Sequence, residues 1–168
     1  MVVFFTISLI LFSEPYLLYG RYFNATYSGN ENNKKHRQLN LPEEKIRELH
    51  QLFEAYVAKQ YYLHQYTSLK NVADHLNTQP YVLSTFINQV YHMHFNDVIN
   101  LHRIKYIEDG LKNEKWESLT LEAIAGKAGF NNRITFLTAF KKFTGFTPTQ
   151  YIKGIHSAKK ENETRQRV

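Results

Sequence analysis

The sequence contains no cysteine, so it has neither a disulfide framework nor thiol chemistry. It also lacks a Gly-rich phosphate loop, a Gly-x-Ser-x-Gly motif and any His and carboxylate spacing that matches a metal-binding helix. His92 and His94 form the one close pair of histidines, and surface or turn positions explain them more simply than a metal does. We therefore expect no metal, no cofactor and no enzyme.

The alternation of apolar and polar residues that is typical of strands is also missing, which predicts an all-α fold. The 168 residues include 12 Tyr and 12 Phe, and 43% of the chain is hydrophobic, which suffices for one domain with a real core. A formal net charge of +6 favours polyanions or anionic lipid as partners, without choosing between them.

Two stretches of the chain, residues 68–90 and 120–143, repeat one apolar pattern about 52 residues apart. The matched positions are Leu69, Val72, Ala73 and Leu76 with Leu121, Ile124, Ala125 and Ala128, and then, after one extra residue in the second turn, Leu83 and Ile87 with Phe136 and Phe140. Each stretch has the form of a helix-turn-helix, whose second helix enters the major groove of DNA. Two such units in one chain indicate two readers of one duplex, and hence gene regulation.

The rest of the pattern divides the chain into five segments. Residues 1–20 are apolar and predict an N-terminal helix, residues 21–40 a linker, residues 41–62 a connecting helix, residues 63–155 the DNA-binding domain, and residues 156–168 a disordered tail. Ser68 or Thr67 should cap the first unit and Thr120 the second, and Gly129 should end a helix with a positive φ. Within the domain, an apolar run over residues 95–112 predicts a linker helix between the two units.

The reading helices should present their solvent-facing side chains to the DNA bases. In the first unit these are Tyr81, Val82, Ser84, Thr85 and Asn88, and in the second Asn132, Arg133, Ile134, Leu137 and Thr138, followed by Lys141 and Lys142. Arg133 could bridge to guanine, Ile134 and Leu137 could meet thymine methyl groups, and the two lysines should hold phosphate.

Each of these assignments has a plainer alternative. Asn132 could pair with adenine or simply cap its helix, and Ile134 and Leu137 could pack against protein instead of a base. Lys141 and Lys142 could form a solvated helix end. Arg103, on the linker helix, is expected to make an ion pair with Glu108 or Asp109 or a helix-end contact, with phosphate as the alternative, and Trp116 is expected to pack against the domain.

The second repeat carries a specific combination of residues, namely Leu121, Ile124, Ala125, Gly129, Phe130, Thr135, Phe136, Ala139, Phe140, Lys141, Lys142, Thr144, Gly145, Phe146, Thr147, Pro148 and Tyr151. This combination resembles the DNA-binding domain of the AraC family of transcription regulators. The resemblance covers roughly residues 65 to 155 and implies sequence-specific binding to double-stranded DNA, with RNA polymerase as a further partner. The first repeat departs from it, because His92 stands where the family usually has Gly, and Ile87-Asn88 replaces the usual Phe-Lys.

The apolar start of the chain suggests a membrane. Residues 1–18 could just span a bilayer as a helix, and the basic residues that follow would place the DNA-binding domain in the cytoplasm, attached to the inner membrane. Leu18-Tyr19-Gly20 resembles the end of the membrane segment in membrane-tethered Bacteroidetes-type relatives, which would mean that a sensor region is missing from this sequence. The alternative is an apolar helix packed on the soluble domain.

A different functional class competes with DNA reading. The first reading helix is unusually poor in Lys and Arg, so the chain could be a basic helical module that binds a protein or a membrane surface without specific DNA binding. Retention on mixed-sequence DNA that depends on salt would separate the two hypotheses.

Overall fold

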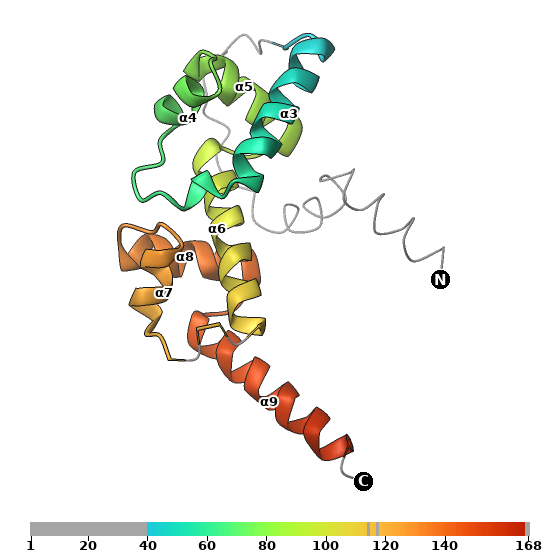
Figure 1. Cartoon of the computed structure of the whole chain (residues 1–168), viewed down its shortest axis with the longest axis vertical. Coiled ribbons are helices and arrows are strands. Elements are labelled where there is room, and N and C mark those ends of the chain that lie inside the picture. Colours follow the sequence, from blue (N-terminus) through green and yellow to red (C-terminus); the bar gives the residue numbers. More distant parts are fainter. Residues whose placement is uncertain (1–39, 114, 117, 167–168) are drawn as a thin grey trace, which may run out of the picture.

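The computed structural model describes residues 40–113, 115–116 and 118–166, and every regular element in them is a helix (Figure 1). The elements are α3 (Glu43–Ala58), η1 (Tyr61–Leu63), α4 (Leu69–His75), α5 (Pro80–Tyr91), α6 (Phe95–Lys112), α7 (Leu121–Lys127), α8 (Arg133–Thr144) and α9 (Pro148–Gln166). The all-α class and the linker helix over residues 95–112 are confirmed. The apolar N-terminal helix and the linker expected before residue 40 lie outside the described residues. None of the helices that are described has the length and apolar character needed to cross a membrane.

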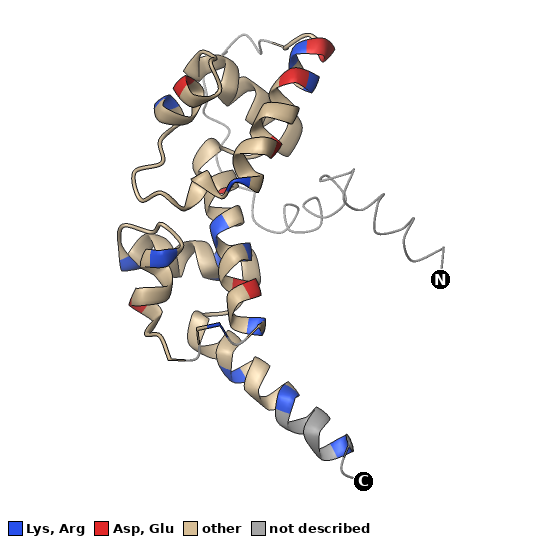
Figure 2. Cartoon of the chain, in the orientation of Figure 1, with Lys and Arg blue, Asp and Glu red and all other residues tan. Residues whose placement is uncertain are grey.

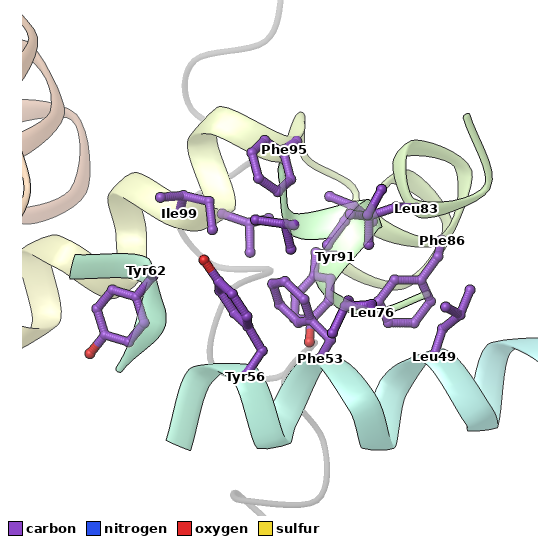
Figure 3. Close-up of a cluster of buried hydrophobic side chains, with 14 residues drawn as sticks. Leu49, Phe53, Tyr56, Tyr62, Leu76, Leu83, Phe86, Tyr91, Phe95 and Ile99 are labelled. Carbon is purple, nitrogen blue, oxygen red and sulfur yellow. The ribbon is translucent and has the colours of Figure 1, made fainter. Parts of the chain in front are cut away.

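The first unit builds its core from α3, α4, α5 and the start of α6 (Figure 3). Leu49, Phe53 and Tyr56 recur at helical spacing along α3 and are buried against this core. The Phe53 ring lies 6.1 Å from the ring of Phe86 and 5.7 Å from that of Tyr91. α3 is therefore packed into the core of the first unit.

The linker helix α6 belongs to both units (Figure 1). Val98 and Ile99 in its first half lie in the first core, and Ile104 and Ile107 in its second half lie in the second core.

His102 lies on α6 between these two sets of residues. Burial lowers the pKa of His102 to about 4, with a smaller contribution from Lys105. The His102 ring is thus neutral at neutral pH, and it packs against the rings of Phe53 and Tyr62 at 6.4 and 5.5 Å.

The second unit packs α7 and α8 against the second half of α6 and the first turn of α9. Phe136 and Phe140 are buried in its centre, with their ring centroids 5.7 Å apart. Trp116 closes the core beside α6 at Gly110, where a Cβ would lie 2.8 Å from the indole ring. The expectation that Trp116 packs against the domain is confirmed.

Helix caps fix the boundaries of the two repeats. The side chains of Ser68 and Thr120 accept hydrogen bonds from Asn71 N and Ala123 N, both at 3.2 Å, as N-caps do. The turns that follow α4 and α7 contain one residue each with positive φ, Asn77 at 51° and Gly129 at 84°. Both residue types tolerate this conformation, which allows the tight turn between the two helices of each unit.

The end of the chain differs from the expected disordered tail. α9 begins at Pro148 and continues as a helix to Gln166, so residues 156–166 are helical. After Gly154 this stretch contains neither Gly nor Pro, and nothing in it breaks the helix that starts in the core. In Figure 1 this helix runs away from the second unit toward the C-terminus.

Candidate nucleic-acid interface

The two reading helices, α5 and α8, are built in the same register. Each has 12 residues, and each ends at a residue with a left-handed backbone, His92 (φ 52°) and Gly145 (φ 79°). The buried positions also match, namely Leu83, Phe86 and Ile87 in α5 with Phe136, Ala139 and Phe140 in α8. Phe86 was missed from the sequence, because its counterpart in the second repeat is the much smaller Ala139. The two helices therefore present equivalent outer faces.

The outer face of α5 is polar but carries no charge. Tyr81 is 60% exposed and Asn88 is exposed, whereas Ser84 and Thr85 are half-buried. The Thr85 hydroxyl donates a hydrogen bond to the backbone carbonyl of Tyr81 at 2.8 Å. Val82 is half-buried as well, and it packs against the first core.

Asn132 takes the plainer of its two expected roles. Its side-chain oxygen accepts a hydrogen bond from Thr135 N at 2.8 Å and caps α8. The side chain is exposed, but its acceptor oxygen is already used within the helix. A contact to adenine would have to share this oxygen with the cap, since an amide oxygen has two lone pairs.

Arg133 is paired with an acid that the sequence did not single out. Its guanidinium donates from Nη1 to Glu122 Oε1 at 2.6 Å, which joins the first turn of α7 to the first turn of α8. Both side chains are more than half exposed, and such surface pairs contribute only about 0–1 kcal/mol. Arg133 can therefore leave Glu122 for DNA at small cost, while Glu122 itself would oppose a nearby phosphate.

The apolar residues of α8 differ in how far they are available. Ile134 is 78% exposed, at the position equivalent to Tyr81 in α5, while Leu137 is half-buried and packs partly on the second core. Thr138, one residue further along this face, is exposed. An exposed β-branched side chain at the start of a reading helix contributes nothing to the protein core and is free to contact a partner.

The two lysines at the end of α8 are not equivalent. Lys141 and Lys142 are both exposed, but Lys142 Nζ donates to Asp97 Oδ1 at 2.7 Å and so ties α8 to the first turn of α6. This contact was missed because the two residues are 45 positions apart in sequence. Lys141 is therefore the better candidate for a phosphate contact.

The charges of the reading units are distributed unevenly (Figure 2). The second unit carries basic residues at the end of α7, at the start of α8 and at the end of α8, namely Lys127, Arg133, Lys141 and Lys142. In the first unit, α5 carries no charged residue, α4 carries Lys70 and Asp74, and the basic residues of α3, Lys45 and Arg47, lie among Glu43, Glu44 and Glu48. The electrostatic attraction to a polyanion would thus come mainly from the second unit.

The arrangement of α4–α5 and α7–α8 on a shared α6 defines a double helix-turn-helix domain. Comparisons with known proteins agree with this class. Residues 72–154 match the family model described as a helix-turn-helix domain. No curated protein matches the chain.

Two solved structures are similar to this one. A protein of unknown function from Listeria innocua shares 28% sequence identity at a TM-score of 0.54, over 62% of this chain and 95% of that chain. The C-terminal domain of AraT, a response regulator from Geobacillus stearothermophilus, shares 25% identity at a TM-score of 0.51, over 68% of this chain and 88% of that chain. The family match and these two likenesses agree with the double helix-turn-helix fold that the geometry defines.

Proposed function

We propose that this chain binds double-stranded DNA in a sequence-specific manner and regulates transcription, with α5 and α8 in adjacent major grooves. The observation that carries the proposal is the common register of the two reading helices on one linker helix. The 18 residues of α6 span about 27 Å, which is close to one turn of DNA at about 34 Å once the flanking units are added. One molecule can then cover two half-sites.

The two units would contribute differently to recognition. The second unit reads bases with Ile134, Leu137, Thr138 and, after release from Glu122, Arg133, and it holds phosphate with Lys141. The first unit offers Tyr81, Ser84, Thr85 and Asn88, whose hydroxyl and amide groups can bond base edges. Because α5 carries no charge, it would add sequence preference with little salt-dependent affinity.

The salt dependence of binding tests whether DNA is held through these cations. Lys141→Ala should weaken binding to all sequences by a similar factor, and it should reduce the slope of log K against log salt by about 0.9, the value for one phosphate contact. Lys142→Ala should change the slope less, because its ammonium is paired with Asp97. Lys45→Ala removes the same charge from α3, where Lys45 pairs with Glu48, and serves as the matched control.

A slope that Lys141→Ala leaves unchanged would show that this residue does not contact phosphate. Binding that responds to salt in none of the variants, including the natural chain, would instead favour the competing function, a helical module for a protein or membrane surface. The uncharged α5 is the observation that keeps this second function under test.

The exposure of Ile134 leads to a second expected result. Replacing thymine with uracil in a selected duplex removes the C5 methyl group and leaves the base-pairing edges unchanged. If Ile134 packs on one such methyl, the substitution at that position should weaken binding by about fourfold, since a buried methylene-sized group contributes about 0.8 kcal/mol. Ile134→Ala should bind the thymine and uracil duplexes equally, as measured by fluorescence anisotropy at fixed salt.

Thr135→Ala provides the control, because Thr135 is exposed on the neighbouring position of α8. This variant should keep the preference for thymine. If Ile134→Ala still distinguishes thymine from uracil by the same factor as the natural chain, Ile134 does not read a methyl group.

A further inference from the structure

Arg103 has no role in the interface described above, and its surroundings are unusual. Among the residues that the structure describes, it is the one charged side chain that is buried, with 7% of its surface exposed. It is not paired with Glu108 or Asp109, the partners that the sequence suggested. Its guanidinium instead donates from Nε to the carbonyl oxygen of Tyr62 at 2.9 Å and from Nη2 to that of His64 at 2.8 Å.

These two carbonyl groups belong to η1 and the residue after it, which lead from α3 into the first helix-turn-helix. The other side of Arg103 faces the second unit. Its guanidinium carbon lies 5.5 Å from the centroid of the Phe130 ring, in the turn between α7 and α8. A single side chain on the linker helix thus contacts both units.

The backbone closes the same junction. Gly129 lies against Leu63, so closely that a Cβ would be 2.8 Å from the Leu63 carbonyl carbon and 3.1 Å from Arg103 Nε. The turn of the second unit therefore rests directly on η1 of the first unit. Without this contact, the described units would be held together mainly by α6, a single helix that can bend and twist along its length.

We propose that Arg103, with Gly129, sets the distance and rotation between the two reading helices and thereby selects one spacing between the two DNA half-sites. This proposal rests on the proposed function. One base pair inserted between half-sites moves the second by about 3.4 Å along the duplex and about 35° around it. If the junction is fixed, the two reading helices cannot adjust to the shifted half-site. If only α6 joins the two units, they can adjust to part of the shift.

The hydrogen bonds of Arg103 can fix the geometry of the junction. Two hydrogen bonds from one planar, charged group fix both the position and the orientation of the carbonyl groups that accept them. Burial lowers the pKa of Arg103, yet an arginine stays protonated in proteins. A lysine at this position has a flexible ammonium and no fixed fork of donors, so Arg103→Lys should retain the charge and lose the fixed geometry.

The test is a selection from random duplexes with the full natural chain, Arg103→Met and Arg103→Lys. The natural chain should enrich a two-part motif with one spacing. Arg103→Met should enrich the same two half-motifs with spacings spread over about one or two base pairs, and Arg103→Lys should give a narrower spread. On duplexes with one inserted base pair, the affinity of the natural chain should fall about tenfold or more, as it does for a mismatched base pair. The affinity of Arg103→Met should fall about threefold or less.

The control is Ile107→Val, a change in the buried part of α6 that destabilises the second core without touching the junction. It should keep the single spacing. If Arg103→Met is unfolded by circular dichroism, Arg103→Lys carries the comparison.

Two results overturn the proposal in different ways. If the folded Arg103 variants lose affinity but keep the single spacing and the full insertion penalty, Arg103 only stabilises the fold. If the natural chain enriches no two-part motif, the proposed function itself fails, and the spacing role fails with it.

Discussion

Phe53→Ala is expected to lower the free energy of unfolding by about 3–5 kcal/mol, because it removes a fully buried ring from the first core. Four aromatic rings surround it, those of Tyr56, Phe86, Tyr91 and His102 at 5.7–6.4 Å. A loss of this size is a large fraction of the total stability of a small domain. Urea unfolding followed by circular dichroism measures it.

The neighbouring residue provides the control for this change. Leu52 is 38% exposed on the same helix, and Leu52→Ala should cost much less than Phe53→Ala. A cost below about 1 kcal/mol for Phe53→Ala would mean that α3 only connects the domain to the segment before it. The expected result instead makes α3 a structural part of the first reading unit.

Gly129→Ala is expected to cost about 2 kcal/mol or more, for two independent reasons. The backbone at Gly129 has φ 84°, a conformation that costs an alanine about 1–3 kcal/mol. The new Cβ would also collide with the backbone of Leu63, and overpacking of this kind costs about 1–3 kcal/mol. Thermal unfolding at neutral pH measures the sum.

Gly126→Ala is the matched substitution, three residues earlier in α7. A Cβ at Gly126 meets no atom within 4 Å, and alanine is a better helix former by about 1 kcal/mol. This variant should therefore be as stable as the natural chain or more stable. If the two variants have equal stability, the turn of the second unit does not rest on η1 as described.

Local chemistry explains which features could be predicted from the sequence. The caps at Ser68 and Thr120 and the positive φ at Gly129 depend on residues within one turn, and all three predictions are confirmed. The register of the two reading helices followed from comparing the repeats, and the burial of Phe136 and Phe140 agrees with it.

Contacts between distant residues could not be predicted in this way. The carbonyl partners of Arg103 lie 39 and 41 residues away in sequence, and a backbone carbonyl has no sequence signature. The sequence therefore suggested the nearest acids, Glu108 and Asp109, which are not its hydrogen-bond partners. Lys142 likewise binds Asp97 across the domain, although nothing in the local pattern of α8 indicates it.

For the candidate site, the structure bears on the exposure of the side chains. Tyr81, Ile134 and Thr138 are exposed on the reading helices as expected. Arg133 is exposed too, but its ion pair with Glu122 depends on how α7 packs against α8, which the sequence does not show. The membrane segment and the RNA polymerase contact stay predictions from the sequence, because the former lies outside the described residues and nothing in the fold bears on the latter.

The central claim, that one molecule reads two adjacent major grooves, is tested most directly by hydroxyl-radical footprinting. The natural chain is titrated onto a duplex obtained by selection, and the stoichiometry is measured on the same samples. We expect two protected windows on one face of the duplex, centred about one helical turn (about 10 base pairs) apart, which appear together at one molecule per duplex. A single window, or a second window that appears only with a second molecule, would contradict the account.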